Sequence, residues 1–352
     1  ASGETKTSCR LTSGIEADLR IVSTEEFPYA LMYFTGSKEH NVKLRGIAKK
    51  KGLKLNEYGL FRDETLIKCR NEADVYRVLD LDYVPPELRE DMGEVEAAQS
   101  AELPCLIELN HIRGMFHIHT DYSDGVDSLQ KIVELAKRMG LSYIGIADHS
   151  KTAAYAGGLK TDKVLRQWEQ IDLINAEDPD FKIFKGIESD ILSDGRLDYA
   201  EDVLKGFDFV IGSVHSQFNL AKEEQEARIV AAMKNPYMTM LGHPTGRLLL
   251  SRNGYDVDMR TVIDAAAETG TIIELNASPY RFDIDWRYMK YTKEKGVMIS
   301  INPDAHSAAE LGEIAYGVDI ARKGWQEPRD ILNTRTASEV AAILRRKRAL
   351  CH

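Results

Sequence analysis

The sequence has 352 residues, of which 43% are hydrophobic and 29% are charged, so it can form one large globular domain and a smaller one. Its net charge of −10 does not indicate nucleic-acid binding, and no apolar run is long enough to cross a membrane. The four cysteines, Cys9, Cys69, Cys105 and Cys351, form no C-x-x-C pair and no signal peptide opens the chain, which predicts a cytoplasmic protein without a disulfide framework.

The first third of the chain separates its charges. Residues 36–62 are basic, with Glu39 and Glu57 as their only acids, whereas residues 87–108 are acidic, with Arg89 as their only cation. A basic segment is usually a solvated face. It becomes a candidate for phosphate contact only beside a nucleic-acid-binding motif.

The N-terminal residues predict a small α+β unit. Residues 7–11 and 15–22 are rich in β-branched and apolar residues, which predicts two strands joined by a turn at Ser13 and Gly14. Asp18 lies in the second of them, where a lone acid is usually structural. A loop is expected at Tyr33–Ser37, and residues 39–51 predict a helix that Gly52 ends.

This segment resembles the family X DNA polymerases over roughly residues 1–85. The matching residues are Asp18-Leu-Arg, Tyr33-Phe34-Thr35-Gly36-Ser37, Asn41 and the run from Lys49 to Tyr58. The resemblance implies a partial palm, in which Asp18 is a metal ligand of the polymerase site, followed by a thumb. It also implies that Tyr33, Phe34, Gly36 and Asn41 line the site of the incoming nucleotide.

The same resemblance implies that the chain is the C-terminal part of a longer polymerase. The paired palm aspartates of the family and its template-binding domain should lie upstream of Ala1. A two-metal polymerase site, with magnesium as its ion, needs all three carboxylates. With Asp18 alone we expect no polymerisation, and the missing N-terminal polymerase segment would be a partner of this chain.

Residues 86–110 are predicted to be an acidic linker before a larger domain at residues 111–352. Pro85 and Pro86 interrupt regular structure, and Pro104 closes the segment. A short helix is expected within it, at residues 94–102.

From Ile112 onward, short buried strands alternate with amphipathic helices. The predicted strands are 114–119, 143–147, 182–187, 207–214, 238–242, 271–276 and 297–302. The predicted helices are 161–176, 222–233, 259–269, 285–295 and 337–348, besides one that follows a capping box at Asp127 and Gln130. The basic end of the last helix, Arg345 to Arg348, is expected to suit the negative end of that helix. The repetition predicts a parallel sheet with right-handed crossovers, either open or closed as a barrel.

Nine side chains that suit metal binding follow the ends of these strands. They are His117, His119, Asp124, His149, Glu188, His215, His243, Asp304 and His306, whereas His40, His111 and His352 lie elsewhere. His117 and His119 should point the same way, because side chains alternate along a strand. One such histidine alone would more simply be a surface or core residue. Since parallel strands of a barrel bring their C-terminal ends to one face, the whole set predicts a metal site.

The ligand types narrow the chemistry. Six imidazoles and three carboxylates exceed what one tetrahedral ion can use, which predicts two or three metals with a bridging carboxylate. Nitrogen and oxygen ligands suit zinc, manganese or iron. Clustered divalent ions favour phosphoester hydrolysis, because they activate water and neutralise phosphoryl oxygens. A serine triad is not expected, since the sequence has no G-x-S-x-G motif.

The motifs H-x-H, SDG, ADHS, GIESD, SVH, GHP and PDAH, in that order, make residues 112–348 resemble a PHP (polymerase and histidinol phosphatase) domain. The resemblance implies an α/β fold, a distorted (β/α)7 barrel with a trinuclear metal centre. One metal would take His117, His119, Glu188 and Asp304, a second would share Glu188 with His215 and His243, and a third would take Asp124, His149 and His306. Of these ligands we expect Glu188, His215 and Asp304 to be catalytic. One position departs from the family, since Met115 stands where many relatives carry an acidic residue.

Other residues near the strand ends are weaker candidates. Asn276 could hydrogen-bond a ligand or the phosphate. Arg247, Arg252 and Arg281 are candidates for DNA phosphate contacts, although surface arginines often form only salt bridges. Tyr155 and Tyr280 are candidates for stacking on a terminal base, although exposed tyrosines are common.

Together the two resemblances imply a metal-dependent phosphoesterase that acts on DNA 3′ ends. The activity would be a 3′–5′ exonuclease or related 3′-end processing in DNA repair, with manganese as the favoured ion. Two alternatives stay open. One is a small-molecule phosphatase of the histidinol-phosphate type, and the other is a barrel without catalysis that serves the polymerase as a scaffold.

Overall fold

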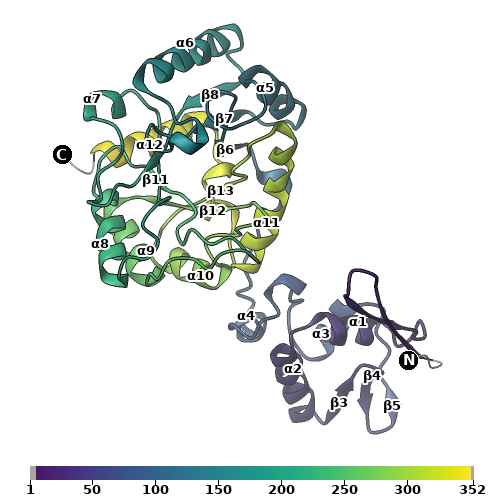
Figure 1. The fold of residues 1–352 in the computed structure, drawn as a ribbon. Coiled ribbons are helices and arrows are strands. Elements are labelled where there is room, and N and C mark those ends of the chain that lie inside the picture. Colours follow the sequence, from purple (N-terminus) through teal and green to yellow (C-terminus); the bar gives the residue numbers. More distant parts are fainter. Residues whose placement is uncertain (1–4, 350–352) are drawn as a thin grey trace. The chain divides into compact units, whose positions relative to one another are not determined.

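A computed structural model of the chain describes residues 5–349 and divides it into two compact units (Figure 1). The first unit ends at Pro104 and the second begins at Cys105. Among the described residues, no helix combines the length and the apolar composition that crossing a membrane would require. Cys9, Cys69 and Cys105 are free thiols, as predicted, whereas Cys351 and His352 lie outside the described residues.

Over residues 5–104, the first unit combines a hairpin, a small sheet and four α-helices. The predicted hairpin is present as antiparallel β1 (Lys6–Arg10) and β2 (Glu16–Arg20). The antiparallel sheet consists of β3 (Leu53–Asn56), β4 (Gly59–Arg62) and β5 (Thr65–Leu66). The helices are α1 (Phe27–Thr35), α2 (Lys38–Lys50), α3 (Glu72–Val78) and α4 (Glu94–Ser100). The expected loop at Tyr33–Ser37 is wrong for its first half, because α1 continues to Thr35 and only Gly36 and Ser37 separate it from α2.

Much of the acidic segment packs within the first unit instead of connecting the two units freely. The Nδ1 atom of His40 lies 2.6 Å from Oε1 of Glu94, and both side chains are buried. Lys43 of α2 pairs with Asp91 at 2.6 Å and with Glu96 at 2.8 Å. Part of the basic helix therefore neutralises the acidic segment.

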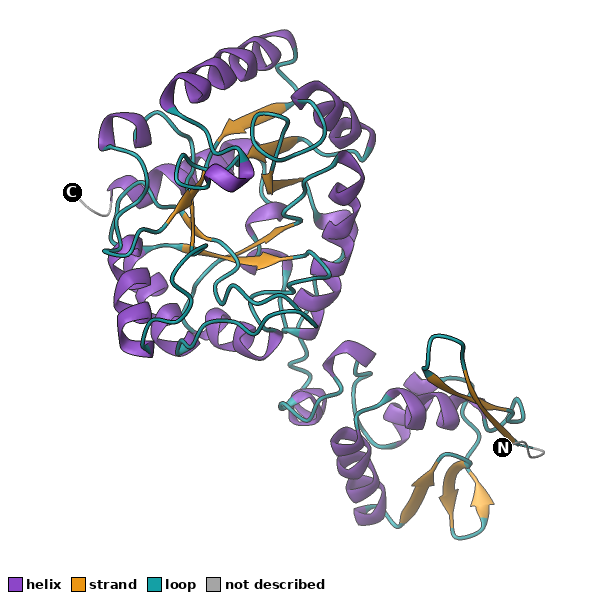
Figure 2. Cartoon of the chain, viewed as in Figure 1, coloured by secondary structure: helices purple, strands orange, loops and turns teal. Residues whose placement is uncertain are grey.

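The second unit is a ring of parallel strands surrounded by helices (Figure 2). The ring consists of two sheets. One sheet contains β6 (Gly114–Ile118), β7 (Tyr143–Ile146) and β8 (Lys182–Lys185). The other contains β9 (Glu188–Asp190), β10 (Ile211–Ser213), β11 (Met240–Leu241), β12 (Ile272–Asn276) and β13 (Ile299–Asn302). Single bridges join the sheets on both sides, from His149 to Glu188 and from Ile118 to Ala305. Because β8 and β9 continue one another, the ring is the predicted distorted (β/α)7 barrel.

The predicted helices of the barrel lie close to where their periodicity places them. They are α5 (Leu129–Arg138), α6 (Thr161–Glu177), α8 (Lys222–Met233), α9 (Met259–Thr269), α10 (Trp286–Glu294) and α12 (Ala337–Ala349). The sequence interpretation missed α7 (Glu201–Leu204) and α11 (Ile314–Lys323). The capping box expected at Asp127 and Gln130 is wrong. Ser128 caps α5 by accepting from the Lys131 amide, and Asp127 instead accepts from the Ala308 amide at 2.8 Å.

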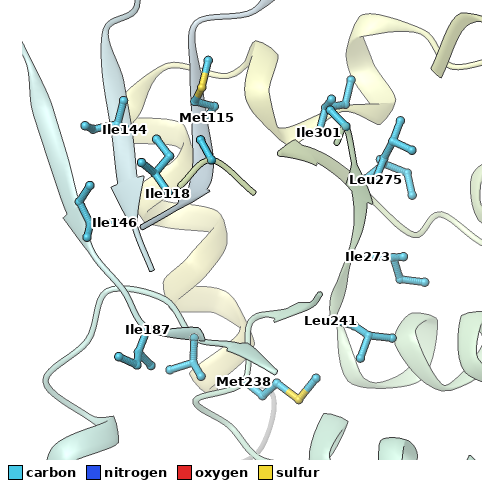
Figure 3. Packing of buried hydrophobic residues seen from close by; sticks show 14 of the residues in the cluster. Met115, Ile118, Ile144, Ile146, Ile187, Met238, Leu241, Ile273, Leu275 and Ile301 are labelled. Atoms are coloured by element: carbon cyan, nitrogen blue, oxygen red, sulfur yellow. The ribbon is translucent and has the colours of Figure 1, made fainter. Parts of the chain in front are cut away.

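Two apolar clusters hold the barrel. Alternate strand residues such as Met115, Ile144 and Ile273 belong to a cluster that also contains the inner faces of the helices (Figure 3). The intervening positions, among them Phe116 and Phe209, form a second cluster with Leu344 of α12. Because neighbouring side chains on a strand point to opposite faces, the second cluster fills the inside of the ring.

A lysine in the basic end of α12 binds the C-terminal ends of two other helices. Lys347 is buried, and its ammonium group donates to the carbonyls of Met233 (2.7 Å) and Thr269 (2.6 Å) and to the hydroxyl of Thr271 (2.9 Å). Met233 and Thr269 are the last residues of α8 and α9, where carbonyls lack intrahelical partners. The last turn of α12 carries Arg346, Lys347 and Arg348, as the sequence predicted. The sequence did not reveal that Lys347 also binds the carbonyl ends of two other helices.

Replacing Lys347 with Met should lower the free energy of unfolding by about 2 kcal/mol, because it leaves buried acceptors without a donor. Urea unfolding of the whole chain measures this loss. Arg346→Met, at the exposed neighbouring position, should change the unfolding free energy by less than about 0.5 kcal/mol. Equal losses in both variants would contradict the capping role.

Candidate metal centre

The structure brings all nine predicted ligands to the C-terminal ends of the barrel strands. His117 lies in β6 and His119 just after it, Asp124 follows in the turn before α5, His149 comes after β7, Glu188 opens β9, His215 comes after β10, His243 after β11, and Asp304 and His306 after β13. Six different strands therefore contribute to one site. This placement is the one that the sequence predicted.

Glu188 is the centre of the site. Its Oε1 atom lies 2.9 Å from Nε2 of His243, 3.1 Å from Nε2 of His215 and 3.3 Å from Nε2 of His117. Its Oε2 atom lies 2.8 Å from Nδ1 of His149. The carboxylate is 1% exposed, so these imidazoles replace the water that an ionised carboxylate would otherwise need.

A second group surrounds Asp124 at the more open side of the site. The Oδ2 atom of Asp124 lies 3.4 Å from Nε2 of His149 and 3.5 Å from Nε2 of His306. The rings of His119 and His306 stack with their centroids 4.2 Å apart. Asp304 lies between this group and the centre, with its Oδ1 atom 3.3 Å from Nε2 of both His117 and His119.

The candidate ligand atoms form four overlapping groups, each with its atoms within 4.8 Å of one another. The groups are His119, Asp124, His149 and His306; His117, His119 and Asp304; His117, Glu188 and His243; and His149, Glu188 and His215. His149 is shared between two of them, although the family resemblance assigns it to one ion. Overlapping groups of nitrogen and oxygen ligands are consistent with a multinuclear metal site.

Unpaired buried atoms support the same interpretation. Nε2 of His117, both ring nitrogens of His119, Nδ1 of His149, Nδ1 of His243 and Oε2 of Glu188 are buried without a hydrogen bond of regular geometry, although Nδ1 of His149 and Oε2 of Glu188 lie 2.8 Å apart. A buried polar atom without a partner costs about 1–3 kcal/mol, so such atoms rarely gather without a reason. Metal ions would provide the missing partners, and the donor set fits them.

The charges of the site act strongly on one another. Burial opposes the charge on His149, but Glu188 and Asp124 raise the pKa of His149 to about 10. Burial likewise opposes ionisation of Glu188, yet the imidazoles of His215, His117 and His149 hold the pKa of Glu188 well below its usual value. His119 differs, because burial and the nearby His149 lower its pKa to about 3. The carboxylates of the site therefore favour positively charged partners. Bound metal ions would compete with protons for the imidazole nitrogens.

Glu274 orients two of the ligands and was missed by the sequence interpretation. Its Oε2 atom lies 2.6 Å from Nδ1 of His117 and accepts from Asn302 at 2.9 Å. Its Oε1 atom accepts from the His243 amide at 2.9 Å and from Asn276 at 3.0 Å. A carboxylate on the far nitrogen of a ligating histidine fixes the ring for metal binding.

Glu274 also supplies the acidic support for His117 that Met115 cannot provide. Met115 is fully buried in the apolar cluster, so it gives His117 no polar support. The support comes from β12 instead. A glutamate and two asparagines at the ends of adjacent buried strands, ELN and SIN, were the signal available in the sequence. Asn276 also donates to Asp304 at 3.0 Å, which confirms that it hydrogen-bonds a candidate ligand.

Two further carboxylates support the centre. Asp190 holds Nδ1 of His215 at 2.5 Å. Asp148 is fully buried and accepts from the amide of Thr120 at 2.8 Å, from the Thr120 hydroxyl at 2.7 Å and from Gln167 at 2.5 Å. Through Thr120 it fixes the turn that leads from His119 to Asp124.

The backbone at the first strand is less regular than an H-x-H strand predicts. The pairing of β6 with β7 shifts register between Met115 and Ile118, and His117 has a φ of 57°. Asp304 has a φ of 55°. Left-handed backbone at residues other than glycine costs about 1–2 kcal/mol and gathers at functional sites. The rings of His117 and His119 still lie with centroids 5.3 Å apart, but their positions depend on this register shift and not on simple alternation along a regular strand.

The predicted nucleotide-site residues of the first unit lie together at the junction of α1 and α2. Asn41 donates to the Tyr33 carbonyl at 2.7 Å, and a Cβ atom at Gly36 would lie 2.8 Å from Oδ1 of Asn41. Phe34 is half exposed. Asp18 is exposed on β2, pairs with Lys6 at 2.7 Å, and belongs to none of the candidate ligand groups found within residues 5–349.

The three candidate arginines differ in what they already contact. Arg281 lies at the site, with Nε 3.2 Å from Oδ2 of Asp304. Arg247 donates to the carbonyls of Arg281 and Phe282 and pairs with Asp285 at 3.0 Å, so its guanidinium is occupied within the barrel. Arg252 donates to the Gly246 carbonyl and lies over the Phe218 ring.

Comparisons with known proteins match both units. The family model of the DNA polymerase beta thumb matches residues 30–90, and the model of the PHP domain matches residues 116–304, more than half of the chain. The chain is 42% identical over 351 residues to a Bacillus subtilis protein named DNA polymerase/3′-5′ exonuclease PolX. That match covers 98% of this chain but 61% of the relative, so the chain spans about 61% of that protein's length.

Further similarities concern the barrel. A Caldanaerobacter subterraneus protein named probable phosphatase is 29% identical over 66% of this chain and 91% of its own length. The crystal structure of histidinol phosphate phosphatase from Lactococcus lactis, complexed with zinc, L-histidinol and phosphate, aligns with a TM-score of 0.43 and 17% identity. The alignment covers 59% of this chain and 93% of that structure.

Replacing Glu274 with Gln should weaken metal binding about 10- to 100-fold, because the new amide would direct N–H groups at two donors that now bind a carboxylate oxygen. Competition with a fluorescent chelator measures the affinity. Glu268→Gln, on the exposed face of α9, is the matched control and should bind metal as the unchanged chain does. An unaltered affinity in Glu274→Gln would contradict the orienting role.

Proposed function

Because the chain belongs to the PHP domain family and carries a DNA polymerase beta thumb before its barrel, we propose that it is a metal-dependent phosphoesterase acting on DNA 3′ ends. The observation that carries the proposal is Glu188, a buried carboxylate within 3.3 Å of imidazoles from four strands. A thumb from a polymerase family makes DNA the substrate class that we favour over a small phosphate ester.

The proposed reaction is hydrolysis of the terminal phosphodiester. Water attacks the phosphorus, the bond from phosphorus to the 3′ oxygen of the preceding nucleotide breaks, and that oxygen receives a proton. The products are a nucleoside 5′-monophosphate and a strand shorter by one nucleotide. The same chemistry at a blocked 3′ end would serve 3′-end processing in DNA repair.

We assign the metal ligands to the nine residues at the strand ends. They are His117, His119, Asp124, His149, Glu188, His215, His243, Asp304 and His306, with Glu188 as the bridging carboxylate. Divalent ions held there, with manganese favoured for activity and zinc or iron as alternatives, would lower the pKa of a water molecule and neutralise phosphoryl charge. Among the ligands, Glu188, His215 and Asp304 are the proposed catalytic residues.

Other residues of the chain would bind and orient the DNA. We propose that Arg281, whose guanidinium lies beside Asp304, contacts a phosphate that enters the site, and that Arg252 contacts a neighbouring phosphate. In the first unit, Tyr33, Phe34, Gly36 and Asn41 are the proposed nucleotide contacts of the thumb. Asp18 is the single carboxylate that the polymerase resemblance assigns to this chain. We therefore expect no template-directed synthesis from these 352 residues alone.

Replacing Glu188 with Gln should lower kcat/KM for hydrolysis of a DNA 3′ end by at least about 100-fold, since even residues that only orient ligands contribute 10- to 100-fold. Release of labelled 3′-terminal nucleotide in the presence of manganese measures this. Glu177→Gln, at the exposed end of α6, is the control. If the unchanged chain hydrolysed histidinol phosphate and no DNA end, the small-molecule alternative would replace the proposal.

Removing bound metal should lower the melting temperature of the barrel by about 5–10 °C, because saturating ligand adds about 2.7 kcal/mol at a hundredfold excess over its dissociation constant. Calorimetry before and after dialysis against chelator measures the shift, and added manganese should restore it. Glu188→Ala should remove the dependence on metal. A purified protein without transition metal and without any shift would favour the scaffold role.

A further inference from the structure

A cavity of about 490 Å³ opens beside the candidate metal centre, and most of its lining residues are not candidate ligands. Its walls are the loop after β9, which includes Leu192 and Arg196, and the residues after β10, His215 to Gln217. Thr152 and Tyr155, from the segment between β7 and α6, line the remaining side. His215 is shared by the cavity and the metal centre, so a group in the cavity would lie next to the reacting atoms.

One buried arginine binds two of the segments that line the cavity. Arg228 of α8 is 3% exposed and donates to the carbonyls of Leu192 at 2.9 Å and Ser216 at 2.9 Å. It also donates to the Ile191 carbonyl at 3.1 Å. One guanidinium therefore joins two of the segments that line the cavity, which holds them in place before a ligand enters.

The charged groups of the cavity are already paired. Arg196 binds Asp194 at 2.6 Å, and Asp190 binds His215 at 2.5 Å and the Thr152 hydroxyl at 2.6 Å. The cavity thus offers no unbalanced cation to a phosphate. Anionic parts of a substrate belong at the metal centre, and the cavity suits a neutral part that follows the phosphate.

Tyr155 provides a flat apolar face at the mouth of the cavity. Its side chain is 76% exposed and lies on a short 3-10 turn, Ala154–Ala156, with its ring centroid 6.4 Å from that of His149. Partial burial of its hydroxyl and the nearby charges of Asp190 and Glu188 raise the pKa of Tyr155 to about 12. The phenol therefore stays neutral and lies close to the carboxylates of the centre.

We infer that this cavity takes the base and sugar of the 3′-terminal nucleotide, with the base stacked on the ring of Tyr155, while its 5′ phosphate lies at the metal centre. The inference rests on the proposed function and specifies its substrate as an unpaired terminal nucleotide. A duplex end would have to fray by one base pair before hydrolysis, because a paired base cannot enter the cavity. Stacking would make the site tolerant of base identity, since every base has a π-face.

The test compares two single-stranded oligonucleotides that differ only at the 3′ end, one ending in deoxyadenosine and one in a tetrahydrofuran abasic residue. The ratio of their kcat/KM values measures what the base contributes. Tyr155→Ala should lower this ratio about 5- to 100-fold. Tyr155→Phe, which keeps the ring, should retain most of it. Deoxyadenosine monophosphate should inhibit Tyr155→Ala more weakly than the unchanged enzyme, while inhibition by inorganic phosphate should not differ.

Specific outcomes would overturn the inference. An equal loss on both oligonucleotides in Tyr155→Ala would mean that the tyrosine supports the site without contacting a base. A ratio lowered by Tyr280→Ala and unchanged by Tyr155→Ala would place the base at Tyr280, an exposed tyrosine that follows β12. If the unchanged chain hydrolysed neither oligonucleotide, the proposed function itself would fail, and that result is distinct from any change in the ratio.

Discussion

The arrangement of side chains at the C-terminal ends of the barrel strands depends on one constraint, the burial of the Glu188 carboxylate. An ionised carboxylate away from water costs several kcal/mol unless charge and hydrogen bonds compensate it. Here the compensation comes from His117, His149, His215 and His243, and each of them follows a different strand. The charge is therefore balanced only when the ring is closed in the correct register. Fold and site are linked for this reason, and bound metal would strengthen the link.

Three further acids, Glu274, Asp190 and Asp148, orient the candidate metal ligands. Glu274 and Asp148 are fully buried, and Asp190 is largely buried. Glu274 and Asp190 each bind the Nδ1 atom of a histidine that is a candidate ligand. Each such contact leaves the Nε2 atom to face Glu188. The Nδ1 atoms of His117 and His215 are therefore hydrogen-bonded to carboxylates, whereas their Nε2 atoms point toward the centre of the site. A metal site requires this arrangement, because the nitrogen that faces the metal must be free to bind it.

Charge is compensated locally in the rest of the chain as well. The basic helix α2 binds the acidic segment through Lys43, and the buried ammonium of Lys347 binds carbonyls at the ends of α8 and α9. In both places a segment that looks like a solvated charged run in the sequence has a defined partner. The net charge of −10 consequently says little about binding, because many of the charged groups already have partners within the chain.

The sequence by itself determined a parallel α/β sheet, the bounds of most barrel helices and the nine candidate ligands, because strand and helix periodicities are local and the C-terminal ends of parallel strands share one face. Periodicity left the sheet either open or closed, and only the family resemblance implied the barrel. The sequence did not determine Glu274 as the support of His117, the left-handed backbone at His117 and Asp304, or the helices that Lys347 caps. It also could not reveal that Arg228 joins two loops around a cavity. Those features depend on contacts between residues far apart in the chain, and only closing the ring brings their atoms within hydrogen-bond distance.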